Sequence, residues 1–227
     1  MTSSTRPRAR KATAPAEFTV ETMSRTPQQG RSKASLERML AAARDLMIER
    51  SSEDFTLIEV SKRGNVSIGS IYLRFESKEN LVRAVLAESM QALENDEAAM
   101  LARLAASSGD LASFVPKFVE AYAAILSEHA ALLRLSMIRA EHDPQVAIPG
   151  KAAALRSATR SVEAMLAYPE LAGEDREVRA NSAYAVIFAT LARQLSLGST
   201  RESVNNQDWT TLKRELGRMS LAYLQAS

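Results

Sequence analysis

The chain has 227 residues, of which 46% are apolar and 25% charged, and its formal net charge is +2. This composition is typical of a soluble globular protein with one large or two small domains, and the lack of cysteine excludes disulfides and thiolate chemistry. The lack of cysteine also fits a reducing cytoplasm, where we expect the protein to be found. No apolar run approaches the ~20 residues that cross a bilayer, so we expect no membrane contact. We expect no metal and no cofactor.

Residues 1–32 are rich in Ser, Thr, Pro and Arg and have almost no large apolar side chains, which predicts a flexible basic arm. Residues 1–33 carry seven basic and two acidic side chains, whereas residues 87–227 carry fourteen basic and seventeen acidic ones. The positive charge lies toward the N-terminus, as expected if that end contacts nucleic acid, although a solubilising tail would have the same composition.

Leucine and alanine dominate the rest of the chain and no alternating strand pattern occurs, so the fold is predicted to be all-α. The first helix should carry an amphipathic stripe about ten residues long that packs over the following segment. Phe55 should pack against Val60 or this helix as a hydrophobic staple. The apolar positions of the stripe are Leu36, Met39, Leu40, Ala43, Leu46 and Met47.

Residues 56–78 contain two short helical patterns, a tight turn and the start of a third helix. Thr56, followed three residues later by Glu59, is a capping box that starts a helix. Gly64 and Asn65 are residue types that tolerate positive φ and end one. The sequence therefore predicts a first short helix from about residue 57 to this turn.

The second short helix is capped by Ser67 and turns Ile71 and Phe75 toward the core, so its other side chains point away. Two such helices form either a helix-turn-helix or an ordinary helical hairpin, and the pattern alone fits both. Gly69 favours the first interpretation, since a helical glycine suits close approach of another surface. Lys78, in the first turn of the next helix, favours it too, because helix N-termini attract phosphate.

This segment resembles the TetR family of bacterial transcriptional regulators. The matching string is ungapped: Thr56, then Val66-Ser67-x-Gly69-Ser70-Ile71-Tyr72-x-x-Phe75-x-Ser77-Lys78-Glu79-x-Leu81. The family usually has Ala-Gly where this chain has Gly64-Asn65, and an aromatic residue or His where Arg74 stands. Asn can adopt the left-handed conformation, so the turn should survive. The resemblance is specific over about residues 33–85 and says only "helical" beyond them.

The resemblance implies a DNA-binding repressor that releases its palindromic operator when a small-molecule effector fills the helical part of the chain. Tyr72 and Lys78 should hold phosphates of double-stranded DNA, with Thr56 assisting through its cap. Ile68, Ser70 and Leu73 should face the bases. The full set of expected DNA contacts is Thr56, Ser67, Ile68, Gly69, Ser70, Tyr72, Leu73, Arg74 and Lys78.

We predict three parts: the arm 1–32, a three-helix DNA-binding domain 33–93 with its motif at 56–75, and a larger helical bundle 94–227 for effector binding and dimerisation. A long helix should run from Ser77 to about residue 106, where Ser107-Ser108-Gly109 breaks it. Asp110 should cap the next helix, and a separate helix should follow at about 129–140. The last three helices are expected at about 150–167, 174–197 and 208–225, with a polar loop at 198–207.

Long packed helices can enclose a small-molecule site. Arg134, Arg139, His129 or His142 could anchor polar groups of a ligand, although apolar residues on helical stripes more often belong to the core. His129 and His142 are not expected to form a metal pair. The candidate pocket residues are Met100, Phe118, Tyr122, Arg134, Met137, Tyr184 and Phe188.

The last two helices have apolar faces broad enough for a homodimer interface or, equally, for an intramolecular core. Dimerisation is expected from the DNA side, because one short recognition helix reads too few base pairs for a specific site. Two other functions stay open: a bundle that only mediates oligomerisation, and an all-helical enzyme. No nucleophile elbow, phosphate-binding Gly loop or paired-His metal helix supports an enzyme.

Overall fold

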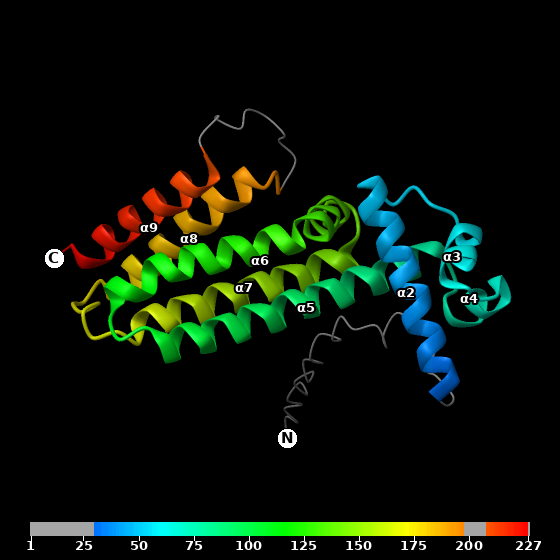
Figure 1. The fold of residues 1–227 in the computed structure, drawn as a ribbon, viewed down its shortest axis with the longest axis horizontal. Coiled ribbons are helices and arrows are strands. Elements are labelled where there is room, and N and C mark those ends of the chain that lie inside the picture. Colours follow the sequence, from blue (N-terminus) through cyan, green and yellow to red (C-terminus); the bar gives the residue numbers. More distant parts are fainter. Residues whose placement is uncertain (1–29, 198–207, 227) are drawn as a thin grey trace, which may run out of the picture.

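The computed structural model describes residues 30–197 and 208–226, and every regular element within these ranges is an α-helix, which confirms the predicted all-α fold. Figure 1 shows an elongated molecule in which α2, α3 and α4 form one end and the C-terminus lies toward the other. The helices are α2 (Gly30–Arg50), α3 (Leu57–Gly64), α4 (Ile68–Arg74), α5 (Lys78–Ser107), α6 (Leu111–Ala140), α7 (Pro144–Leu166), α8 (Arg176–Gln194) and α9 (Trp209–Gln225).

Two predicted segments fall largely or wholly outside the described residues. The predicted arm 1–32 lies outside the described residues except for its last three, and these three begin α2 instead of continuing the arm. The polar loop 198–207 is not among the described residues. Within 30–197 and 208–226, no helix combines the length and apolar character needed to cross a membrane.

A first hydrophobic core joins α2, α3, α4 and the start of α5. Of the predicted stripe on α2 all but the partly buried Leu36 are fully buried, and Phe55 is buried in the same core as Val60, as predicted. This core also takes in side chains from the far end of α6 and the start of α7, so the short helices rest on the bundle. These additional members are Leu132, Leu135 and Val146.

The prediction of two helices between residues 110 and 140 was wrong, because α6 is one helix of 30 residues. The segment around His129 contains neither Gly nor Pro, so nothing in it ends a helix. Pro116 lies early in α6, where it removes one backbone hydrogen bond without interrupting the helix.

The start of α7 also differs from the predicted residue 150, since the helix begins at Pro144. Asp143 caps it by accepting a hydrogen bond from the Gln145 backbone N–H at 3.1 Å. Proline is well suited to the first helical position, where its missing N–H is not needed. The early start also brings Val146 into the first core, where it is 1% exposed.

A second core fills the bundle of α5 to α9 and contains a row of aromatic rings. Phe114, Phe118 and Tyr122 follow one another along α6, with successive ring centroids 5.8 and 5.3 Å apart. The row continues to Tyr184 at 6.1 Å and from there to Phe188 at 6.3 Å, both on α8. This arrangement ties α8 to α6 along the middle of the bundle.

Candidate nucleic-acid interface and ligand cavity

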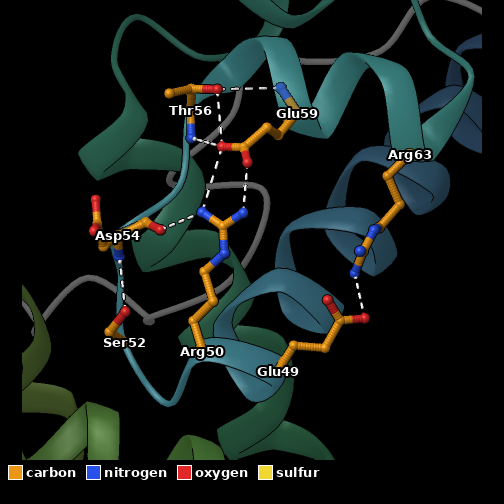
Figure 2. Close-up of polar contacts among 7 residues, drawn as sticks. All are labelled: Glu49, Arg50, Ser52, Asp54, Thr56, Glu59 and Arg63. Atoms are coloured by element: carbon orange, nitrogen blue, oxygen red, sulfur yellow. Dashed lines mark hydrogen bonds and ion pairs between the residues drawn. The ribbon is translucent and has the colours of Figure 1, made fainter.

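The entry to the helix-turn-helix is held by the predicted capping box and by an arginine of α2 (Figure 2). The Thr56 hydroxyl accepts a hydrogen bond from the Glu59 backbone N–H at 3.2 Å, and the Glu59 carboxylate accepts one from the Thr56 N–H at 2.8 Å. Arg50 donates to the Glu59 carboxylate at 2.5 Å and to the Asp54 carbonyl at 2.5 Å. Arg50 therefore ties the end of α2 to the loop that follows it and to the first turn of α3.

These donors act on the Glu59 carboxylate. The Arg50 guanidinium, followed by the backbone and hydroxyl of Thr56, lowers the pKa of Glu59 to about 2. A second ion pair, between Arg63 and Glu49 at 2.6 Å, joins the end of α3 to the end of α2. Neither arginine was predicted from the sequence to have this role, because their partners lie nine and fourteen residues away in the chain.

The turn between α3 and α4 uses the predicted Gly64-Asn65 pair, but the two residues have different roles. Asn65 takes the left-handed conformation, with φ 48° and ψ 51°. Gly64 remains helical, and a Cβ on it would lie 2.9 Å from the Arg38 carbonyl oxygen of α2. Asparagine therefore turns the chain, while glycine allows α3 to pack closely on α2.

The α4 helix is capped by Ser67, whose hydroxyl accepts a hydrogen bond from the Ser70 N–H at 3.1 Å, as predicted. Ile71 is fully buried, whereas Tyr72 is 56% and Leu73 72% exposed. A Cβ on Gly69 would meet no described atom within 4 Å, so the close packing of α4 inside the protein does not require glycine there. One face of α4 thus lies in the core and the other is open.

Of the nine predicted DNA contacts, Arg74 is the one that the structure places on the buried side, at 8% exposure. It follows Ile71 by three residues, and side chains three apart share a helix face. Lys78 is half-buried, with its ammonium 4.8 Å from the centroid of the Phe55 ring. The open face of this region consists of Thr56, Ser67, Ile68, Gly69, Tyr72 and Leu73, with Ser70 half-exposed.

A cavity of about 530 Å³ lies between α5, α6, α7 and α8. Its wall includes four of the predicted pocket residues, Tyr122, Met137, Tyr184 and Phe188. Most of the other wall residues are apolar, among them Met90, Leu93, Leu126, Leu133, Val146 and Ala153.

Three predicted pocket residues do not line this cavity. Met100 and Phe118 lie in the second core, at 1% and 0% exposure. Arg134 donates to the carbonyl oxygens of Leu195 at 2.9 Å and Ser196 at 3.0 Å, where it ties α6 to the end of α8. Periodicity identifies the buried side of a helix but cannot separate close-packed positions from those beside a cavity.

The suggested polar anchors are also occupied elsewhere or lie outside the cavity wall. The His129 ring is 2.8 Å from the Asp96 carboxylate. His142 is exposed, and neither histidine lines the cavity. Arg139 belongs to a buried ion-pair network that lies between the cavity and the short helices.

The cavity wall contains a polar cluster that was not predicted from the sequence. The Ser157 hydroxyl donates to the Glu97 carboxylate at 2.9 Å and is 3.3 Å from the Tyr184 hydroxyl, which is 3.0 Å from that of Tyr122. Burial raises the pKa of Glu97, and it also raises those of Tyr122 and Tyr184. The sequence feature that could have revealed this cluster is Glu97 itself, an acidic residue on the apolar side of α5.

The network around Arg139 connects the corner between α6 and α7 to the loop before α3. The Arg139 guanidinium donates to the Glu53 carboxylate and, at 2.8 Å, to Asp143. Arg83 of α5 donates to the same Asp143 oxygen at 2.8 Å. Burial opposes ionisation of Asp143, but the two arginines outweigh it and lower the pKa of this carboxyl group.

Comparison with known proteins relates the helix-turn-helix segment to a known family and the fold to solved structures. Residues 39–85 match the profile of "Bacterial regulatory proteins, tetR family". No curated protein sequence matches the chain significantly. A protein assigned to the TetR family of transcriptional regulators, from Mesorhizobium loti MAFF303099, shares the fold with a TM-score of 0.65 at 18% identity, over 87% of this chain and 96% of that one.

Two further solved structures share the fold at low identity. GusR of Salmonella enterica has a TM-score of 0.60 at 22% identity, over 85% of this chain and 96% of its own. A bacterial regulatory protein in the TetR family from Rhodococcus RHA1 has a TM-score of 0.57 at 16% identity, over 85% and 98%. Residues 39–85, which contain the helix-turn-helix, thus match the profile of the TetR family of bacterial regulatory proteins, and the fold is shared with these solved structures over most of the chain.

Proposed function

We propose that the protein is a ligand-responsive repressor that binds a palindromic DNA operator as a homodimer in the cytoplasm. The observation that carries the DNA part is the open face of α4, where Ile68, Tyr72 and Leu73 are 38%, 56% and 72% exposed. Large apolar side chains exposed together on one short helix suit a surface that a partner covers. In a helix-turn-helix, that partner is the major groove.

Within this face we assign two kinds of contact. Tyr72, Lys78 and the capped Thr56 hold phosphates, so Tyr72→Phe and Lys78→Ala weaken binding to all duplexes alike. Ile68, Ser70 and Leu73 face the bases, where the apolar side chains suit thymine methyl groups. Arg74 is left out because its side chain is buried.

The homodimer is supported by apolar side chains on the outer surfaces of the last two helices. Val178 and Val186 of α8 are 65% and 53% exposed, and Met219 and Tyr223 of α9 are 67% and 45% exposed. A dimer would bury them and would place two copies of α4 about 34 to 36 Å apart, one turn of DNA. Light scattering that finds only monomers at micromolar concentration would contradict this assembly.

The cavity favours a ligand-responsive protein over a bundle that serves only for oligomerisation. Its wall includes Ala140, Glu141 and Val146, on either side of the α6–α7 corner. That corner holds Arg139 and Asp143, and Arg139 in turn bonds to Glu53 in the loop before α3. We propose that a ligand in the cavity displaces this corner and also tilts α5, which runs from the helix-turn-helix to the cavity. Both movements would change the positions of the two recognition helices in the dimer.

The test is a binding titration of the full chain against the DNA that flanks its own gene, with a scrambled duplex as control. A specific complex is expected, with a slope of about −0.9 in log K against log salt for each phosphate contacted. Leu73→Ala is expected to change operator choice with an unchanged melting temperature. Equal affinity for both duplexes, or no dependence on salt, would refute the proposal.

A further inference from the structure

The interior of the cavity has one carboxyl group that solvent barely reaches. Glu97 lies on α5, is 4% exposed and contributes to the cavity wall. A carboxylate in apolar surroundings is unfavourable unless it is paired or well hydrogen-bonded. Its surroundings in the ligand-free protein therefore indicate what a ligand has to supply.

Glu97 accepts a hydrogen bond from the Ser157 hydroxyl at 2.9 Å. Within the described residues, no ion pair within 4.0 Å joins it to a basic side chain. Glu94, one turn earlier on α5 and also in the wall, is different, because Arg156 lies 2.5 Å and Arg160 3.8 Å from its oxygens. The cavity thus has one carboxylate held in short ion pairs and one, Glu97, on which Arg160 and His129 act only from a greater distance.

The rest of the wall also suits positive charge. The rings of Tyr122, Tyr184 and Phe188 line the cavity in sequence, with successive centroids 6.1 and 6.3 Å apart. The hydroxyls of the two tyrosines belong to the polar cluster that contains Glu97. Aromatic faces attract cations because their quadrupole is negative at the face. The remaining charged residues of the wall, Glu141 and Lys151, are both exposed and offset each other.

We propose that the cavity binds an amphiphilic cation, an apolar molecule with one positively charged nitrogen that pairs with Glu97. The proposal rests on the ligand-responsive function proposed above and names the chemical class of its effector. A cation supplies the charge that the buried carboxylate lacks, whereas a neutral hydroxyl group supplies a hydrogen bond alone. An anion would be repelled by the carboxylate and by the aromatic faces.

Three probes with the same apolar part distinguish these cases: phenylbutylamine, phenylbutanol and phenylbutyrate. Calorimetric titration of the full chain in slightly alkaline buffer should give the tightest binding for the amine. The alcohol should bind at least about tenfold more weakly, a difference of about 1.4 kcal/mol, and the carboxylate more weakly still. This ranking is expected for the protein in the absence of DNA.

Two variants on the same helix locate the effect. Glu97→Gln keeps the shape and the acceptor for Ser157, and should weaken binding of the amine by about thirtyfold while leaving the alcohol unchanged. Glu94→Gln removes the same charge from the same wall, but its carboxylate already has arginine partners, so it should change amine binding by less than about threefold.

Three results would overturn the proposal: equal or tighter binding of the alcohol or the carboxylate, an unchanged amine affinity in Glu97→Gln, or no binding by any probe. The same preparations should be titrated with operator DNA. Intact DNA binding alongside any of these results overturns the ligand class and leaves the DNA-binding function standing. Loss of DNA binding with the expected probe ranking would leave the ligand class standing and count against the regulator.

Discussion

The helix-turn-helix and the cavity depart from the usual distribution of side chains in opposite ways. On α4, Tyr72 and Leu73 are large, partly or wholly apolar, and more than half exposed. In the cavity, Glu97 is acidic and 4% exposed. A buried charge and a cluster of exposed apolar side chains are both unfavourable in the isolated protein. Each therefore marks a surface that gains stability when a partner covers or neutralises it.

Two glutamates show the same contrast in their titration. Glu59, at the entry to the helix-turn-helix, is surrounded by donors from Arg50 and Thr56, and its pKa is lowered to about 2. Glu97 accepts one side-chain hydrogen bond, from Ser157, and burial raises its pKa. The first carboxylate has its partners inside the protein, which identifies it as structural. The second has no basic side chain in direct ion-pair contact, which makes it a candidate for binding a cation.

The largest effect is expected from breaking the link between these two regions at Arg139. This side chain bonds to both Glu53 and Asp143 and is 7% exposed. Arg139→Met removes one of the two arginines that pair with the buried Asp143, and also the donor to Glu53, and should lower the free energy of unfolding by about 3 to 5 kcal/mol. It should also bring the operator affinities measured with and without a saturating ligand close together.

Arg134→Met is the matched control for Arg139→Met. Arg134 also lies on α6, but it bonds to carbonyl oxygens at the end of α8 instead of to the loop before α3. The control should lower stability while leaving the ratio of the two operator affinities as in the wild type. A ratio that survives in Arg139→Met would show that the signal takes another route, such as the tilt of α5.

The two faces of α4 should respond differently to loss of side chains. Ile71→Ala empties a fully buried position and should cost about 2 to 5 kcal/mol in urea denaturation. Leu73→Ala, at a position 72% exposed, should change stability by less than about 0.5 kcal/mol. Comparable losses in both variants would place Leu73 in the core and remove it from the proposed DNA contacts.

The helix-turn-helix could be predicted closely because its determinants are local in sequence. The predicted caps at Thr56 and Ser67 are confirmed, and each accepts from a backbone N–H three residues later, as Ser77 does at the start of α5. Asn65 was one of two candidates for the turn. What sequence could not assign was Gly64, whose role depends on the Arg38 carbonyl oxygen of another helix.

The cavity was less predictable because its wall comes from four helices. Tyr122 and Tyr184 were identified from aromatic content, but their hydroxyls meet across 62 residues of sequence. Ser157 and Glu97 gave no local signal that they would face each other. The prediction of two helices where α6 is one shows a related difficulty. A break was inferred before residue 129, although no Gly or Pro stands there to end the helix.

Replacing Glu97 should reveal the cost of its burial. Because the pKa of Glu97 is raised in the folded protein, its ionisation destabilises the fold as the pH rises above the ordinary value of 4.5. The Glu97→Gln variant should therefore gain stability relative to the wild type from pH 4.5 toward neutral pH, as measured by melting temperature. A difference that stays constant with pH would mean that a cation inside the protein already compensates this carboxylate.

Replacing Glu59 should give a smaller effect with the opposite dependence on pH. A lowered pKa means that the ionised carboxylate stabilises the folded state above the ordinary value of 4.5, and that this contribution is lost as the pH falls toward 2. Glu59→Gln should therefore melt below the wild type at neutral pH, and the two melting temperatures should converge as the pH is lowered from 4.5. Solvent screens the exposed pair of Arg50 and Glu59, so this change in stability is expected to be smaller than those at Arg139, Ile71 and Glu97.

Arg50→Met provides the internal control, because Arg50 is the largest cause of the lowered pKa of Glu59. In a double-mutant cycle, Glu59→Gln should have less effect in the Arg50→Met background, and its dependence on pH should weaken. Additive effects of the two substitutions would mean that Glu59 acts through Thr56 alone. The capping box would then hold the loop at the start of α3, and Arg50 would contact the loop only through the Asp54 carbonyl (Figure 2).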